Sequence, residues 1–277
     1  MVSRTSHAES PLTRMVFGTA WLGVYLAIVL TPLAIVFIGP IPEGRGFWTE
    51  LSVALGFVGL STLGLQFAIT GRLRPVAAPY GIDVLLQFHR QIAVVATVLV
   101  LAHPVILFVQ NPRRLALLNL LDAPWPARFG VPALVLLGVS VCLAIWRRRL
   151  RLPYEVWRVT HGLLAVLIVA FALVHVELIG HYVDLPWKRA AWAAMSVGMI
   201  ALLLYVRLLR PLMMLRRPYR VVDVRPEGGR ATTLVFEAEG HEGMRFSPGQ
   251  FAWLTLGSSP FALDDHPFSF SSSGSPP

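Results

Sequence analysis

Four histidines in apolar stretches of the sequence have a spacing that suits metal binding inside a membrane. His89 and His103 lie 14 residues apart, and so do His161 and His175. Fourteen residues of α-helix rise about 21 Å and turn through about 1400°, which is roughly 40° short of four full turns. Each pair therefore predicts two imidazoles on one face of a spanning helix, one near each side of the bilayer.

The two stretches are expected to run in the same direction across the membrane, because two crossings separate their starts. His89 then lies level with His161, and His103 lies level with His175. Two histidines that face each other at one depth can supply both axial ligands of a b-type haem. Such a six-coordinate haem suits electron transfer rather than oxygen binding. Two haems stacked across the bilayer would form a path for electrons.

Other uses of intramembrane histidines compete with haem binding. The four imidazoles could be satisfied by interhelical hydrogen bonds, or they could form a proton relay. Zinc or copper is a further alternative, but the pairs are far apart and have no nearby Cys or Asp ligand. The identical spacing on two parallel spans favours haem, so we expect two b haems with these four histidines as iron ligands.

Arginines and a tryptophan flank the expected inner haem site. Arg90 directly follows His89, and Arg158 lies one turn before His161. A guanidinium pairs well with a carboxylate, so both arginines are candidates to bind the haem propionates. Both also suit the cytoplasmic edge of a span. Trp157 could cover the porphyrin edge, and it fits the aromatic belt of the membrane interface equally well.

The remaining candidate ligands carry less weight. His7 in the N-terminal tail, His181 just past a spanning stretch and His241 in a turn are each expected to be solvated. The single cysteine, Cys142, excludes several metal sites and cross-links within the chain. These are a disulfide framework, a Cys-ligated zinc, an iron–sulfur cluster and a thioether-linked haem.

The composition predicts the membrane helices that must position these histidines. Of the 277 residues, 55% are hydrophobic and 14% are charged, whereas a soluble domain carries about 25% charged residues. A spanning helix takes about 20 apolar residues, and six stretches approach or exceed that length. They are Val16 to Ile38, Leu51 to Ile69, Val84 to Val109, Val131 to Trp146, Val156 to Ile179 and Arg189 to Leu209. Leu115–Leu121 is too short to cross and is expected to lie at the interface.

Basic residues set the expected orientation. The net charge of +9 would suggest nucleic acid binding in a soluble protein, but the positive-inside bias of membrane proteins explains it more simply. With a cytoplasmic N-terminus, 15 of the basic residues up to position 220 fall on the inner side and six on the outer side. The outer six are Arg45, Arg113, Arg114, Arg128, Lys188 and Arg189. We therefore expect a multi-pass protein of the inner (plasma) membrane with both termini in the cytoplasm, the lipid bilayer as its surroundings and no nucleic acid partner.

The predicted domains are a cytoplasmic tail at 1–15, a six-span haem-binding domain at 16–210 and a β-domain at 219–277. After a basic hinge, three stretches alternate as strands do, with glycine turns between them. These stretches are Tyr219–Val224, Thr232–Ala238 and Phe251–Leu256. The fold class is therefore an all-α membrane bundle of six helices, followed by the N-terminal part of a small antiparallel β-barrel.

The membrane motifs resemble a known family. Phe88-His89-Arg90, His103, the run from Tyr154 to His161 and His175 are similar to the ferric reductase-like transmembrane domain. That domain is shared by ferric reductases, NADPH oxidases and many bacterial flavocytochromes. The resemblance implies six spans, bis-histidine haems between the third and fifth spans, and a cytoplasmic flavin domain of the ferredoxin reductase type. Equal spacing on both helices is closer to ferric reductases than to NADPH oxidases.

The tail carries a second part of the resemblance. The stretch from Phe246 to Phe251, with Pro248 and Gln250 as FAD-binding candidates, resembles the family's strand that leads to flavin. His266-Pro267-Phe268-Ser269 resembles its flavin-binding motif. By this analogy Phe268 would lie against the flavin ring and Ser269 near its reactive nitrogen. His266 would take the place of a phosphate-contacting basic residue.

The function implied by the resemblance is a transmembrane oxidoreductase, with no residue assigned a catalytic role beyond cofactor binding. Electrons would pass from NAD(P)H to FAD, to the inner haem, to the outer haem and then to an external small-molecule or metal-chelate acceptor such as ferric iron. NAD(P)H rests on the family analogy alone, because the sequence contains no glycine-rich phosphate loop. The tail is also expected to be too short to complete the flavin barrel.

Three alternatives stay open. The chain could be a haem-only membrane subunit fed by a separate flavoprotein reductase, which the short tail favours. It could be a superoxide-producing enzyme of the NADPH oxidase kind. It could also be a transport or scaffold protein without haem.

Overall fold

The computed structural model describes residues 11–71, 73, 76, 80–244, 246, 250–257, 259, 261 and 265–270. His7 and Pro248 lie outside these described residues. The chain divides into two compact units, Met1–Leu203 and Leu204–Pro277. Each unit is described by itself below.

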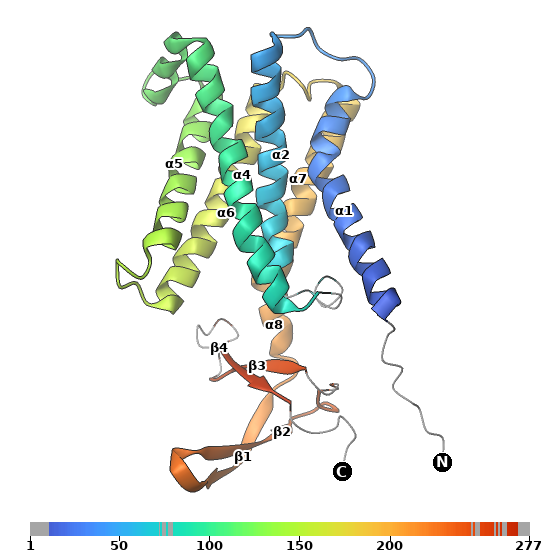
Figure 1. Ribbon diagram of the computed structural model, residues 1–277, viewed down its shortest axis with the longest axis vertical. Coiled ribbons are helices and arrows are strands. Elements are labelled where there is room, and N and C mark those ends of the chain that lie inside the picture. The colour runs from blue at the N-terminus through green and yellow to red at the C-terminus, as the bar shows by residue number, and fades with distance from the viewer. Residues whose placement is uncertain are drawn as a thin grey trace. The chain divides into compact units, whose positions relative to one another are not determined.

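Six helices of the described residues are long and apolar enough to cross a membrane, as the sequence predicts (Figure 1). They are α1 (Pro11–Phe37), α2 (Phe47–Thr70), α4 (Ile82–Gln110), α5 (Trp125–Trp146), α6 (Tyr154–Ile179) and α7 (Pro186–Leu204). The sixth span continues beyond α7 through the π-helical segment η2 (Tyr205–Leu209) and the short helix α8 (Arg210–Met214). In a bilayer a helix satisfies its own backbone hydrogen bonds, so long apolar stretches fold this way.

The largest difference from the predicted spans is at α5, which begins at Trp125 rather than at Val131. Pro126 stands in the first turn, where the missing proline N–H costs no intrahelical bond. Pro132 is accommodated inside the helix. The extra turns bring the carbonyl of Pro126 into the bundle, where it becomes part of the histidine site.

The segment expected at the interface, Leu115–Leu121, overlaps a 3-10 helix, η1 (Pro112–Leu118). The side chain of Asn111 caps it by accepting a hydrogen bond from the Arg113 N–H at 3.1 Å. At seven residues η1 is too short to cross a membrane. It connects α4 to α5, so the prediction of a short non-spanning piece between the third and fourth spans is confirmed.

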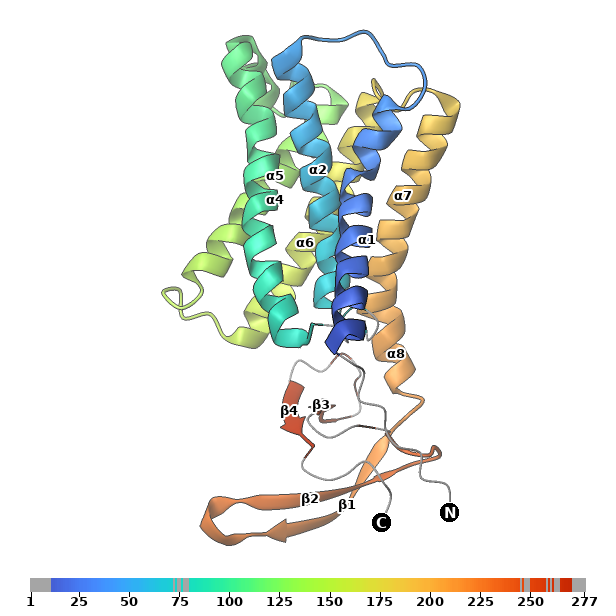
Figure 2. The ribbon, with the colours of Figure 1, turned by 45° about the vertical axis from the view of Figure 1, so that its right-hand side comes forward.

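Helix α2 lies near the centre of the bundle in both ribbon views (Figures 1 and 2). Half of its most apolar window is buried, against 6 to 22% for the other spans. Phe57 of α2 packs edge-on against Trp192 of α7, with ring centroids 5.5 Å apart. Gly59 of α2 allows a close approach of α4, because a Cβ added to Gly59 would lie 2.6 Å from the side chain of Val100. Small residues at such contacts are typical of membrane helix packing.

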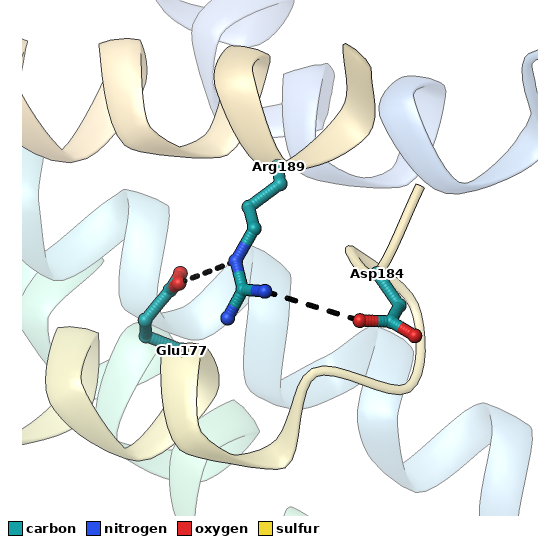
Figure 3. A network of polar contacts seen from close by, with 3 residues as sticks. All are labelled: Glu177, Asp184 and Arg189. Carbon is teal, nitrogen blue, oxygen red and sulfur yellow. Dashed lines mark hydrogen bonds and ion pairs between the residues drawn. The ribbon is translucent and has the colours of Figure 1, made fainter. Parts of the chain in front are cut away.

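Two basic residues, Lys188 and Arg189, make polar contacts that join the ends of helices on one side of the bundle. Lys188, which is only 1% exposed, donates hydrogen bonds to the carbonyls of Val36 and Pro40 at 2.7 and 2.8 Å, and so ties α7 to the end of α1. Arg189 of α7 lies between Glu177 of α6 and Asp184, at 2.8 and 3.9 Å (Figure 3). The charge of Lys188, counted above among the outer residues, is therefore buried and hydrogen-bonded rather than in an open loop.

The described residues of the second unit form four strands in two separate antiparallel pairs. Strand β1 (Tyr219–Pro226) pairs with β2 (Thr232–Ala238), and β3 (Phe251–Thr255) pairs with β4 (Asp265–Ser269). The turn η3 (Gly228–Arg230) between β1 and β2 contains Gly229 at φ 74°, a conformation that favours glycine. Three of these strands lie where the sequence predicts them.

Strand β4 contains the His266–Ser269 motif, for which the sequence analysis predicted no strand. In the structure His266 lies opposite Leu254 and Phe268 lies opposite Ala252. The motif contains a proline and has no clear alternation, so its sequence gives little strand signal. Pairing with β3 supplies the extended conformation.

Candidate metal centre: two histidine pairs between α4 and α6

Helices α4 and α6 bring the four predicted histidines together in the predicted pairs. The ring centroids of His89 and His161 are 6.5 Å apart, and those of His103 and His175 are 6.4 Å apart. The ring planes are inclined by 88° in the first pair and by 69° in the second. Both pairs join one residue of α4 to one of α6, so the two helices run parallel at matched depths.

The separation of the rings fits one metal between them. An imidazole nitrogen binds a metal at about 2.0 Å and lies roughly 1.1 Å from its ring centre, so two imidazoles on opposite sides of one metal would have centroids about 6.2 Å apart. Both observed distances are close to that value. Among the described residues no group of three or more His, Cys, Asp or Glu gathers at one point. Two axial nitrogens suit a haem, whereas a zinc site needs three or four protein ligands.

Both histidines of α4 are anchored by polar residues of α2. His89 Nδ1 donates to Gln66 Oε1 at 2.6 Å, and the Gln66 amide is oriented by its own donation to the Thr62 carbonyl at 3.1 Å. His103 Nδ1 lies 3.0 Å from both the hydroxyl and the carbonyl oxygen of Ser52. The Ser52 hydroxyl donates to the His103 carbonyl at 2.8 Å, so its oxygen accepts from the ring.

Both histidines of α6 are anchored in the same way by α5. His161 Nδ1 lies 3.0 Å from Ser140 Oγ, and His175 Nδ1 donates to the carbonyl of Pro126 at 2.8 Å. A metal-bound histidine normally uses its second ring nitrogen in such a bond, which fixes the tautomer and the ring plane. Because each Nδ1 is engaged by the protein, Nε2 is the nitrogen that a metal would use.

The anchors repeat the spacing of the histidines, which the sequence analysis missed. Ser52 and Gln66 are 14 residues apart, and so are Pro126 and Ser140. The three polar side chains are at most 8% exposed. The 14-residue spacing of polar residues in apolar stretches next to the histidine stretches could have revealed the anchors Ser52 and Gln66. The role of Pro126 could not be predicted in this way, because it depends on a backbone carbonyl that any residue has.

Two glycines let the anchoring helices approach the second pair. A Cβ on Gly56 of α2 would lie 3.3 Å from the ring of His103, and one on Gly130 of α5 would lie 2.7 Å from Nδ1 of His175. Each glycine stands one turn after the anchoring residue of the same histidine, Ser52 or Pro126. The close contact at Gly130 has no room for a side chain.

A cavity of about 200 Å³ adjoins the second pair. His103 and His175 line it together with apolar residues of α2, α4, α5 and α6, and Arg45, His181 and Tyr182 line it from the connecting loops. The sequence analysis expected His181 to be solvated, and this expectation is wrong because His181 lines the cavity. Its Nε2 is buried without a hydrogen-bond partner among the described residues, and its ring packs edge-on against Tyr182 at 4.7 Å.

Three of the residues near this cavity form a hydrogen-bonded cluster that the sequence did not reveal. The Tyr182 hydroxyl donates to Glu50 Oε2 at 2.6 Å and accepts from Arg45 Nη2 at 2.9 Å. The backbone N–H of Arg45 donates to Glu50 Oε1 at 2.9 Å. Burial, followed by the hydrogen bond to Glu50, raises the pKa of Tyr182 above its usual range, so the phenol stays neutral.

The first pair is bordered by an aromatic cluster instead. Trp157 stacks on His161 with centroids 5.2 Å apart and planes inclined by 19°. Arg90 is exposed and Arg158 is half-buried, on the same helices as His89 and His161. The role of the two arginines toward haem propionates stays a prediction.

The predicted flavin residues of the second unit lie on the β3–β4 pair. His266, Pro267, Phe268 and Ser269 are all exposed on β4. The carbonyl of Gln250 accepts a hydrogen bond from the Phe270 N–H at 3.0 Å, so Gln250 is next to the end of this motif. FAD binding by these residues stays a prediction.

Comparison with known proteins identifies the membrane part. Residues 55–172 match the model of a family described as ferric reductase like transmembrane component. The matched range contains three of the four histidines and ends just before His175. No curated protein matches the chain. Residues 55–172, within the membrane part of this chain, are therefore similar to the ferric reductase-like transmembrane family.

Proposed function

We propose that this membrane oxidoreductase carries electrons across the bilayer through two b-type haems. His89 and His161 would hold the inner haem, and His103 and His175 the outer one. The observation that carries the proposal is the geometry of the two pairs, whose ring centroids are 6.5 and 6.4 Å apart. When bound, haem iron supplies reversible one-electron chemistry, and the protein supplies ligation, orientation and the surrounding dielectric.

The residues of the chain explain why the sites would transfer electrons rather than bind a substrate at iron. Each pair would hold its haem iron with one histidine from α4 and one from α6, which would leave no iron position for a substrate. The Nδ1 hydrogen bonds to Gln66, Ser52, Ser140 and Pro126 hold the rings in one orientation. A rigid ligand set needs little rearrangement when the charge of the metal changes, which favours rapid transfer.

The direction of transfer rests on the charge distribution and the family. With both termini in the cytoplasm, the inner pair lies at the cytoplasmic end of α4 and α6, and the His266–Ser269 motif would bind FAD reduced by NAD(P)H in the same compartment. The outer pair then faces the external acceptor, such as a ferric chelate. The cavity beside His103 and His175, with Arg45 among its lining residues, supports an approach of the acceptor from this side.

A second candidate is a haem subunit that receives electrons from a separate flavoprotein. The described strands of the β-unit form two separate two-stranded sheets rather than one closed barrel. In this candidate a separate reductase would supply the flavin. Adding a soluble flavoprotein reductase to the purified chain would distinguish this candidate, because haem reduction would then require the added protein.

Transmembrane electron transfer can be measured in proteoliposomes. The purified full chain is reconstituted around trapped ferricyanide, and dithionite is added outside. We expect the trapped ferricyanide to be reduced rapidly with the wild-type chain and at the background rate of empty liposomes with the His89→Ala/His103→Ala double variant. Equal rates for the two proteins would contradict the proposal.

A further inference from the structure

The first two turns of α6 present three aromatic rings in sequence. Trp157 stacks on His161 at 5.2 Å with an interplanar angle of 19°, and Tyr154 lies 5.8 Å from Trp157 at 37°. Residues three and four apart on a helix are neighbours, so the order Tyr154, Trp157, His161 forms one row. Rotation of the His161 ring about its χ2 angle would break the stacking contact.

Trp157 is held in turn by the end of α5. The guanidinium carbon of Arg147 lies 5.4 Å from the ring centroids of both Tyr154 and Trp157. A guanidinium over aromatic faces is attracted by their quadrupoles. Trp157 therefore contacts a fixed cation as well as the candidate ligand His161.

The indole nitrogen of Trp157 is an unsatisfied donor within the described part of the chain. Trp157 Nε1 is buried and has no hydrogen-bond partner among the described residues. An indole N–H can only donate, and a buried donor without an acceptor is costly. Such an exception is commonly explained by a partner outside the protein, and here the nearest candidate is the group that the adjacent histidine pair would bind.

We propose that Trp157 is a positioning residue for the inner haem. Its ring fixes the plane of the His161 imidazole, and its N–H donates to a carboxylate oxygen of a haem propionate. This inference rests on the proposed function, because it requires His89 and His161 to ligate iron. It also distinguishes the two sites, since no ring other than that of His103 pairs with His175 among the described residues.

Two variants separate the stacking contact from the hydrogen bond. Trp157→Phe keeps an aromatic face but loses the N–H, whereas Trp157→Ala loses both. Trp146→Phe is the matched control, because Trp146 is a half-exposed tryptophan at the end of α5. The measurements are haem content, the low-spin ferric EPR signals and the two midpoint potentials of the purified full chain. The His103→Ala background, which should retain only the inner haem, assigns each change to a site.

In Trp157→Phe we expect unchanged EPR signals and a lower midpoint potential for the inner haem, because the carboxylate loses a donor that offsets its negative charge. In Trp157→Ala we also expect a shifted EPR signal for the same haem, because this signal depends on the angle between the two imidazole planes. The outer haem and the Trp146→Phe control should match the wild type.

Haem content separates this inference from the proposed function. Wild-type protein without haem would overturn both. Haem-replete variants with wild-type potentials and EPR signals would overturn the role of Trp157 alone. An unchanged potential in Trp157→Phe would overturn the hydrogen bond to the carboxylate, whatever the alanine variant shows.

Discussion

At the scale of single residues, the hydrogen bonds at Nδ1 decide what the four histidines can do. When Nδ1–H of a histidine ring donates a hydrogen bond to Gln66 or to the Pro126 carbonyl, the lone pair that could bind a metal is on Nε2. These anchors also hold each ring in one plane before any metal binds. If the four histidines hold metal as proposed, their orientation therefore depends on residues that would bind no metal themselves.

The anchor of His103 can be tested with a matched serine. Ser52→Ala removes the hydroxyl that lies 3.0 Å from Nδ1. Because the loss of such an indirect contact typically lowers metal affinity by about 10- to 100-fold, we expect weaker retention of the outer haem during titration with apomyoglobin as haem acceptor. Ser61→Ala is the control, since Ser61 is equally buried on α2 and its hydroxyl has no partner among the described residues. Equal haem loss from both variants would contradict the role of Ser52.

The sequence predicts the histidines better than their surroundings, for a physical reason. A helix converts the 14-residue spacing of His89 and His103 directly into a shared face, and the equal spacing of His161 and His175 on a second span that runs in the same direction predicts the pairing. The Pro126 carbonyl and the buried position of His181 depend on how other helices and loops pack. Neither leaves a pattern in the local sequence.

At the scale of elements, the site is built from two helical hairpins. Helix α2 supports the histidines of α4, and α5 supports those of α6, with anchors and ligands both 14 residues apart. Gly56 and Gly130 set how closely each supporting helix approaches its outer histidine. Helix packing, rather than a loop, therefore fixes the distance between the rings.

The approach of α5 can be tested by adding one methyl group. Gly130→Ala would place a Cβ 2.7 Å from Nδ1 of His175. The ring or the helix must then shift, at a cost of about 1–3 kcal/mol for an overpacked site. We expect this variant to lose the outer haem while it keeps the inner one, as judged by haem content and by the loss of one midpoint potential. Gly138→Ala on the same helix is the control, because nothing lies within 4 Å of its added Cβ. Two haems of wild-type potential in Gly130→Ala would be incompatible with this packing.

The elements of the β-unit were only partly predictable. Alternation over Thr232–Ala238 predicts β2 because a strand exposes its two faces in turn. Strand β4 carries a proline and gains its extended form from pairing with β3, which is a contact between distant residues. Such pairing cannot be read from one segment at a time.

At the scale of the whole molecule, six spans place the two ends of the membrane region on the same side. From the basic residues up to position 220, 15 on that side and six on the other, we propose that it is the cytoplasmic side. A reporter that is active only outside the cytoplasm should therefore be silent after Pro277 and active at Asn119, which follows η1. The opposite activities would place the His266–Ser269 motif outside the cytoplasm and remove the proposed electron donor.

The central claim is that the two histidine pairs each hold one haem, and haem stoichiometry tests it most directly. The pyridine haemochrome assay on the purified chain should give two b haems in the wild type. It should give about one in each of His89→Ala, His103→Ala, His161→Ala and His175→Ala. His241→Ala, at an exposed histidine of the β-unit, should keep two. Retention of both haems in any of the four variants, or no haem in the wild-type protein, would contradict the account.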